Sequence, residues 1–261
     1  MKLRNLWIFV VLASLAAVQL CGAQEITVAA AADLQFAFQD VAAHFQKDTG
    51  KNVKLIFGSS GNFFTQIQNG GPFDVFFSAD IDYPKKLEAA GLTEPGTLYQ
   101  YATGRIVLWV RNESKLDLGH GLGVLLDPTI RKIALANPEH APYGRAAVAA
   151  MKHDNVYDKI SNKFVLGENI SQAASFVASG SADIGIVALS LALAPAMKQN
   201  GRYVEISADA YPPLEQAAVI LKSSPQKGLA RQFIDFLKTS PILELLRSYG
   251  FSVPRGSAVR Q

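Results

Sequence analysis

The sequence predicts an α/β protein built from two units, each a mixed, mostly parallel sheet flanked by helices. Three observations support this prediction. Short apolar runs of strand character alternate with amphipathic segments, the alternation resumes in mid-chain with different residues, and no flexible linker separates the two parts. Strands that alternate with helices are typical of sheets that helices cover on both faces.

In the first part of the chain, four expected strands are separated by three expected helices. The first helix carries Leu34, Phe38, Val41 and Phe45 on one face, at the spacing of an amphipathic helix. Gly50 is the expected end of that helix. The expected strands are 26–30, 53–57, 74–77 and 106–110, and the expected helices are 33–47, 62–69 and 83–90.

The second part repeats the alternation and returns to the first unit at its end. The expected strands are 133–135, 164–165, 183–187 and 215–220, and the expected helices are 144–153, 171–179, 227–238 and 242–249. We expect the chain to pass between the units through strand segments near 103–110 and near 203–213. The first unit then consists of residues 25–104 together with 213–254, and the second unit consists of residues 105–212. Residues 255–261 form a polar tail.

Residues 1–24 have the pattern of a secretory signal peptide. Basic Lys2 and Arg4 precede an apolar run over 6–20, and the small residues Gly22 and Ala23 stand before the expected cleavage site. The run is shorter than the roughly 20 residues that span a bilayer. We therefore expect an exported, periplasmic protein. An uncleaved anchor and a lipoprotein acylated at Cys21 are the alternatives.

Composition excludes several classes of function. Loss of Lys2 and Arg4 leaves 23 basic residues against 22 acidic ones, a balance that indicates neither a nucleic acid nor an acidic membrane as partner. Cys21 is the only cysteine, so the mature chain is expected to have no disulfide and no thiolate nucleophile. The four histidines, His44, His120, His140 and His153, lack the spacing of metal ligands.

The turns after the strands are the expected place for a ligand, because ligands of open α/β sheets bind beyond the carboxyl ends of strands. The candidate turns are 31–33, 58–62, 142–144 and 168–171. In 58–61, small residues and two serines favour anion binding at a helix start. The alternative is that Ser59 or Ser60 only caps the helix. Tyr143 is either a wall residue or a ligand donor.

Signatures of an enzyme are missing from the sequence. It contains no Gly-x-Ser-x-Gly nucleophile elbow and no Walker loop. Carboxylates such as Asp80 with Asp82, or Asp48 with Glu139, show no pattern that pairs them for catalysis, and we interpret them as surface charges.

Six blocks of sequence, in order, resemble the periplasmic molybdate-binding proteins of ABC importers, which belong to the type II periplasmic binding protein superfamily. The likeness extends from about residue 25 to residue 254. The blocks are 26–34, 57–61, 74–80, 137–144, 184–187 and 247–251.

The resemblance implies a two-lobed clamshell that holds its ligand between the lobes. It also implies capture of molybdate, and of tungstate in most members, for delivery to an ABC permease. No enzymatic activity and no cofactor are implied, and we expect a monomer. An oxoanion such as sulfate or a carboxylate-ligated metal species in the same fold, and an exported α/β enzyme, are the alternatives.

Carried over by position, the resemblance points to four ligand residues. The positions of two serines in the family correspond to Asp33 and Ser60 in this chain. The positions of two backbone amide donors correspond to Tyr143 and Ile170. A tyrosine that some members use falls on Ala188, and we expect the hydroxyl of Tyr143 to replace it. No separate metal site is implied, because these four residues hold the molybdenum only as its oxoanion.

Asp33 is the departure from the family pattern. A carboxylate about 4 Å from a dianion costs several kcal/mol for each unit of charge at an effective dielectric constant near 20. We therefore expect the Asp33 side chain to turn back as the N-cap of its own helix, so that only its amide meets the ligand. Otherwise Asp33 is protonated, or the ligand is not a simple oxoanion.

Overall fold

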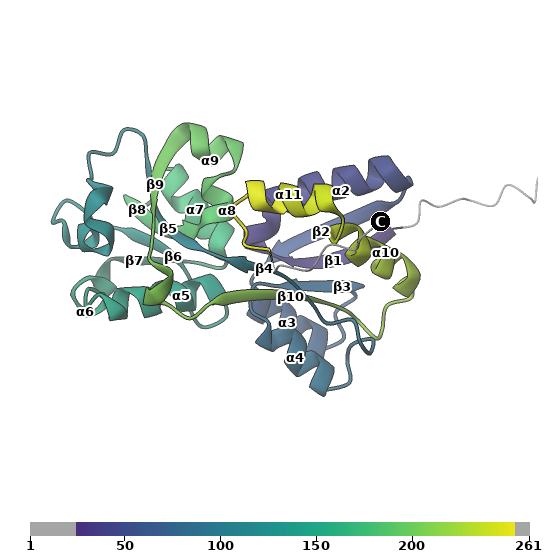
Figure 1. Cartoon of the computed structure of the whole chain (residues 1–261). Helices are drawn as coiled ribbons and strands as arrows, with labels where there is room; N and C mark the ends of the chain where they lie inside the picture. The colour runs from purple at the N-terminus through teal and green to yellow at the C-terminus, as the bar shows by residue number, and fades with distance from the viewer. Residues whose placement is uncertain (1–24, 254–261) are drawn as a thin grey trace, which may run out of the picture.

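Two five-stranded sheets form the two halves of the molecule (Figure 1). The computed structural model describes residues 25–253, so the expected signal peptide and the expected tail 255–261 lie outside the described residues. The strand order is β2-β1-β3-β10-β4 in the first sheet and β7-β6-β8-β5-β9 in the second. Each sheet contains two parallel and two antiparallel pairs.

The first sheet combines strands from both ends of the described chain. In Figure 1, α2 and α11 lie over one face of this sheet, while α3 and α4 lie on the other. Its strands are β1 (Glu25–Ala31), β2 (Asn52–Gly58), β3 (Val75–Ser78), β4 (Tyr99–Gly104) and β10 (Leu214–Ile220). Its helices are α2 (Gln35–Thr49), α3 (Ser60–Gln68), α4 (Asp82–Ala89), α10 (Lys227–Leu237) and α11 (Ser240–Ser248), and a 3-10 turn η1 (Ala32–Leu34) precedes α2.

Alternation along the strands fills both faces of the first sheet. Val28 and Phe77 pack on one side with the apolar residues of α2, α10 and α11. Their chain neighbours Ala29 and Phe76 pack on the other side with those of α3 and α4. Successive side chains of a strand point to opposite faces, so a strand that is apolar at every position is buried on both.

The second sheet is built from the middle of the chain. Its apolar residues and those of the helices around it form one core. Its strands are β5 (Ile106–Arg111), β6 (Ile133–Ala136), β7 (Phe164–Gly167), β8 (Ile184–Ala188) and β9 (Gly201–Glu205). Its helices are α5 (Pro142–His153), α6 (Tyr157–Ile160), α7 (Ile170–Ala178), α8 (Leu189–Ala192) and α9 (Pro195–Asn200), with 3-10 segments η2 (Leu118–Leu126), η3 (Ser161–Lys163) and η4 (Ala208–Ala210).

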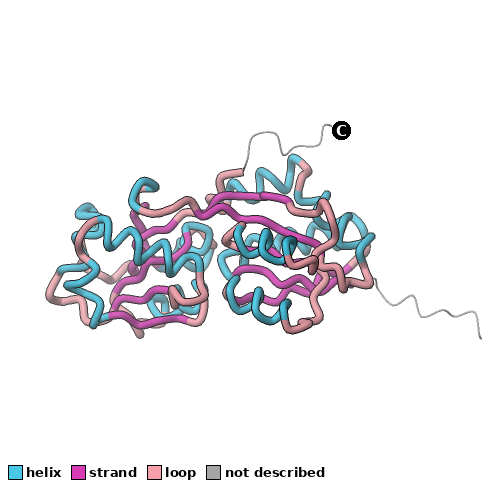
Figure 2. Tube along the Cα trace, turned by 90° about the horizontal axis from the view of Figure 1, so that it is seen from below, coloured by secondary structure: helices cyan, strands magenta, loops and turns pink. Residues whose placement is uncertain are grey.

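The chain crosses between the halves at two neighbouring places, which Figure 2 shows as extended segments. β4 leads into β5 through Arg105 alone, and β9 leads to β10 through the segment that holds η4. The predicted domain limits, 25–104 with 213–254 and 105–212, follow these crossings and stay a prediction. Among residues 25–253, no helix combines the length and the apolar character needed to cross a membrane.

The predicted fold class is confirmed, and each expected strand and helix within the described residues has a counterpart. The prediction missed the short helices, and it placed β4 and β9 only by their ends, as strand segments near 103–110 and 203–213. These segments are short or half-buried, so their sequences carry little periodicity. The first helix was predicted to begin at Asp33, but the chain makes the turn η1 before α2 begins at Gln35.

Candidate functional site

The carboxyl ends of parallel strands from both sheets meet at one small cavity. β1 and β2 end at Ala31 and Gly58, and β6 and β7 end at Ala136 and Gly167. The turns that follow these strands surround a cavity of about 10 Å³, close to the space that one water molecule requires. The lining residues are Ala31, Ala32, Asp33, Gly58, Ser59, Ser60, Ala79, Ala141, Pro142, Tyr143, Asn169 and Ile170.

The structure brings together the four residues that the sequence analysis singled out. Asp33 and Ser60 come from the first sheet, Tyr143 and Ile170 come from the second, and all four line the cavity. No lysine, arginine or histidine is among the lining residues. Their role in holding a ligand stays a prediction.

Ser59 and Ser60 have different functions in the structure. Ser59 is the N-cap of α3, and its Oγ accepts a hydrogen bond from the amide of Asn62 at 3.4 Å. Ser60 is 1% exposed, and its Oγ accepts a hydrogen bond from the amide of Ala79 at 2.9 Å. An accepting hydroxyl keeps its own hydrogen, so Ser60 is able to donate to a group in the cavity.

Two helices present backbone N–H groups at the cavity. Tyr143 lies in the first turn of α5, where Pro142 occupies the start and the cap residue Ala141 makes no side-chain bond. Ile170 is the first residue of α7, and its cap Asn169 accepts from the amide of Gln172 at 3.0 Å. Within the described residues, no backbone or side-chain hydrogen bond uses the amide of Tyr143 or Ile170. First-turn amides have no partner within their own helix, and they suit an anion.

Asp33 does not cap its helix, so that prediction was wrong. η1 and α2 lack a side-chain cap, and the Oδ2 of Asp33 instead accepts hydrogen bonds from the Tyr143 hydroxyl at 2.9 Å and from Gln216 Nε2 at 2.7 Å. The reason is the turn η1, which places Asp33 inside a 3-10 segment rather than before the helix. The Tyr143 hydroxyl, expected to serve the ligand, thus serves Asp33.

Burial makes the Asp33 carboxyl unusual. The residue is 1% exposed, and its Oδ1 has no hydrogen-bond partner among the described residues. Burial raises the pKa of Asp33 from its usual 3.8 to about 6, although the hydrogen bonds from Gln216 and Tyr143 act to lower that pKa. Burial, together with the nearby Asp33, also raises the pKa of Tyr143 well above its usual value.

The sequence analysis did not single out Gln216, which holds Asp33 in place. Gln216 is fully buried on β10, and its Oε1 accepts a hydrogen bond from the Tyr101 hydroxyl at 2.8 Å. That bond aims the Gln216 amide at Asp33. Ser190 on α8 adds a hydrogen bond to the Asp33 carbonyl oxygen at 2.7 Å. A lone amide within an apolar strand was the signal in the sequence, because a buried polar group requires a partner.

Direct contacts across the two halves close the cavity. The Gly61 amide donates to the His140 carbonyl at 2.9 Å, and the Ser59 hydroxyl meets His140 Nδ1 at 2.9 Å. A Cβ on Gly61 would lie 2.6 Å from that carbonyl oxygen, so only glycine permits this approach. Asn62 also bonds Glu168, and Ser171 bonds Gln35.

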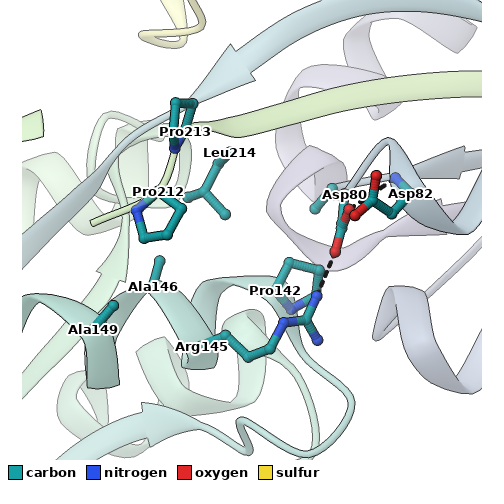
Figure 3. Close-up of a pocket in the computed structure, with 10 residues that line it drawn as sticks. Asp80, Asp82, Pro142, Arg145, Ala146, Ala149, Pro212, Pro213 and Leu214 are labelled. Carbon is teal, nitrogen blue, oxygen red and sulfur yellow. Dashed lines mark hydrogen bonds and ion pairs between the residues drawn. The ribbon is translucent and has the colours of Figure 1, made fainter.

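A second pocket, of about 270 Å³, lies beside the chain crossings (Figure 3). Arg145 on α5 forms an ion pair with Asp80 at one end of it, while Pro212, Pro213 and Leu214 form the opposite wall. Asp80, interpreted from the sequence as a surface charge, therefore links the two halves. In residues 25–253, no group of three His, Cys, Asp or Glu side chains is placed to hold a metal ion.

Comparison with known proteins agrees with the architecture. The family described as bacterial extracellular solute-binding protein matches residues 26–252. The molybdate-binding protein ModA of Rhodobacter capsulatus is 39% identical over 229 residues, which cover 88% of each chain. ModA of Azotobacter vinelandii is 38% identical over 235 residues, 89% of this chain and 92% of the relative.

The solved periplasmic molybdate-binding protein of Azotobacter vinelandii superposes with a TM-score of 0.83 at 36% identity. The superposition covers 88% of this chain and all of that structure. Sequence and fold agree over nearly the whole described length. The chain therefore belongs to the family of bacterial extracellular solute-binding proteins.

Proposed function

We propose that the protein captures molybdate between its two halves and delivers it to an ABC permease. The observation that carries this proposal is the meeting of the Ser60 hydroxyl with the amides of Tyr143 and Ile170 at one cavity without a cationic side chain. The relatives named as molybdate-binding proteins, 39% and 38% identical, support the choice of ligand. They are binding proteins, so we assign no reaction to this chain.

Uncharged donors are sufficient to hold an oxoanion. The helix starts at α3, α5 and α7 each add partial positive charge beside the cavity. A hydrogen bond to a charged group contributes about 1.5–3 kcal/mol. Several such bonds, less the costs of desolvation and ordering, reach about −8 kcal/mol, which is micromolar affinity.

Size is the proposed basis of selectivity among oxoanions. Molybdate and tungstate have nearly the same size, and sulfate is smaller, so donors spaced for the larger ions leave sulfate with longer hydrogen bonds. We therefore include tungstate as a ligand. The cavity is smaller than any of these ions, so the two halves must separate for the ligand to enter, and they must close around it with the cavity walls farther apart than they are here.

Closure is the signal that we propose the permease recognises. The bonds that Gly61 and Ser59 make to His140, together with the pair between Arg145 and Asp80, form only when the halves meet. Lobes 25–104 with 213–254 and 105–212 would move as rigid bodies about the two chain crossings. We propose that the protein works as a monomer in the periplasm after loss of 1–24, with acylation at Cys21 as the alternative.

Isothermal titration calorimetry with molybdate, tungstate, sulfate and phosphate tests this function. We expect one site of micromolar or tighter affinity for molybdate and tungstate, with binding of sulfate and phosphate at least about a hundredfold weaker. Equal affinity for sulfate would overturn the molybdate assignment. Binding of none of the four ions would overturn the whole proposal.

A further inference from the structure

One buried oxygen at the cavity has no hydrogen-bond partner in the described part of the chain, and no role has been assigned to it. Asp33 lines the cavity with Ser60, Tyr143 and Ile170. Its Oδ2 is occupied by two donors, whereas its Oδ1 is buried and without a hydrogen bond among the described residues. An unsatisfied buried polar atom is costly, so an oxygen of this kind beside a ligand cavity points to a ligand contact.

Among residues 25–253, no positive charge compensates the Asp33 carboxyl. The titratable groups nearest to it are the hydroxyls of Tyr143 on α5 and of Tyr101 on β4, and both have pKa values raised well above their usual range. Both tyrosines are therefore neutral. The elements packed on the turn η1 are α2, α7, α8 and β2, and they make no charged contact with the Asp33 side chain among the described residues.

Two negative groups cannot share this cavity without a proton. An ionised Asp33 would repel a bound dianion in surroundings that screen charge poorly. A protonated Asp33 removes the repulsion, and its Oδ1–H becomes an additional donor to the anion. Oδ2 keeps both donors, because a neutral carboxyl still accepts the hydrogen bonds from Tyr143 and Gln216, although each is weaker than the bond to a carboxylate.

We propose that the oxoanion is captured together with one proton, which lies between Asp33 Oδ1 and an oxygen of the anion and makes Asp33 a hydrogen-bond donor to the anion. This inference rests on the proposed function. The proton comes from solvent, no covalent bond of the anion breaks, and opening of the halves returns the proton to solvent with the anion. The three neutral donors hold the anion, and Asp33 links the strength of that hold to pH.

The proposal predicts how affinity depends on pH. The pKa of Asp33 in the ligand-free protein is raised to about 6. Below that pH the proton is already present, so the affinity is constant. Above it, each complex must take up a proton, and the dissociation constant rises about tenfold per pH unit.

Calorimetric titration with molybdate at about pH 5.5, 6.5, 7.5 and 8.5 tests the proposal. We expect the dissociation constant to rise about tenfold from pH 7.5 to 8.5. Titration at pH 8.5 in two buffers with different heats of ionisation should show uptake of about one proton per molybdate. This second measurement uses the unaltered protein and therefore does not depend on how any variant folds.

Variants separate Asp33 from other acidic groups. Asp33→Asn keeps a neutral side chain at every pH, so we expect a pH-independent dissociation constant and no proton uptake. Asp48→Asn is a matched change at an exposed acidic residue. Its molybdate dissociation constant should depend on pH as that of the unaltered protein does. Ser60→Ala should raise the molybdate dissociation constant by a factor that does not change with pH.

The outcomes distinguish this inference from the function on which it rests. A dissociation constant that stays flat between about pH 6.5 and 8.5, with no proton uptake, would overturn the shared proton and leave molybdate binding intact. A slope that persists in Asp33→Asn would assign the proton to another group. Failure to bind molybdate even at about pH 5.5 would overturn the proposed function itself.

Discussion

The ligand-free protein should be destabilised by Asp33 at neutral pH, and Asp33→Asn should relieve that destabilisation. Burial raises the pKa of Asp33 from 3.8 to about 6 in the folded protein. A shift of that size corresponds to about 3 kcal/mol between the two protonation states. Because Asp33 is 1% exposed, solvent does little to screen its charge.

The sign of the effect follows from proton linkage. The folded protein binds the Asp33 proton more tightly than the unfolded chain does. The stabilisation that this proton gives to the folded protein is therefore fully present below about pH 3.8 and is lost as the pH rises through about 6. Asp33→Asn has no such proton. From this ionisation alone, its unfolding free energy should differ from that of the unaltered protein by less than about 1 kcal/mol near pH 4 and exceed it by about 3 kcal/mol near pH 8.

Urea unfolding of both proteins at about pH 4, 6 and 8, without any oxoanion, measures this difference. Subtracting the unfolding free energy of one protein from that of the other removes the contributions of all titratable groups that the two proteins share. A difference of the same size at pH 4 and pH 8 would refute the reasoning, because it would place the effect in packing or hydrogen bonding rather than in ionisation.

Three further substitutions test the site. Ser60→Ala removes one donor, so molybdate affinity measured by calorimetry should fall by about 1–3 kcal/mol, and the unfolding midpoint should also fall because the buried Ala79 amide loses its acceptor; unchanged affinity would remove Ser60 from the site. Tyr143→Phe deletes a hydrogen bond that lowers the pKa of Asp33, so the pH at which molybdate affinity begins to fall should rise; a fall at lower pH would contradict the network. Gly61→Ala places a Cβ 2.6 Å from the His140 carbonyl, so closure and molybdate affinity should weaken by about 1–3 kcal/mol, and an unaffected affinity would show that this contact is not required.

Much of the fold was predictable because its elements are strongly patterned. Leu34, Phe38, Val41 and Phe45 were expected on one helix face, and all four are fully buried in the core of the first sheet. The strands that precede the turns around the cavity were expected because they are apolar runs. Such runs are the pattern of strands that are buried on both faces. β9 was placed only approximately, as a strand segment near 203–213, because its residues are half-buried or exposed and show no such run.

The candidate site was predictable in position but not in its internal bonds. The turn at Ser60 could be found because parallel strands place their following turns at one edge. The direction of the Asp33 side chain could not be found in the same way. It depends on Tyr143 and Gln216, which lie 110 and 183 residues away in sequence, and local capping rules do not contain such contacts.

The crystal structure of the protein with molybdate tests the central claim most directly. We predict that oxygens of the anion lie about 2.7–3.2 Å from Ser60 Oγ and from the amide nitrogens of Tyr143 and Ile170, with no lysine or arginine in contact. Molybdate bound elsewhere on the chain, or held in this cavity by a cationic side chain, would contradict the account.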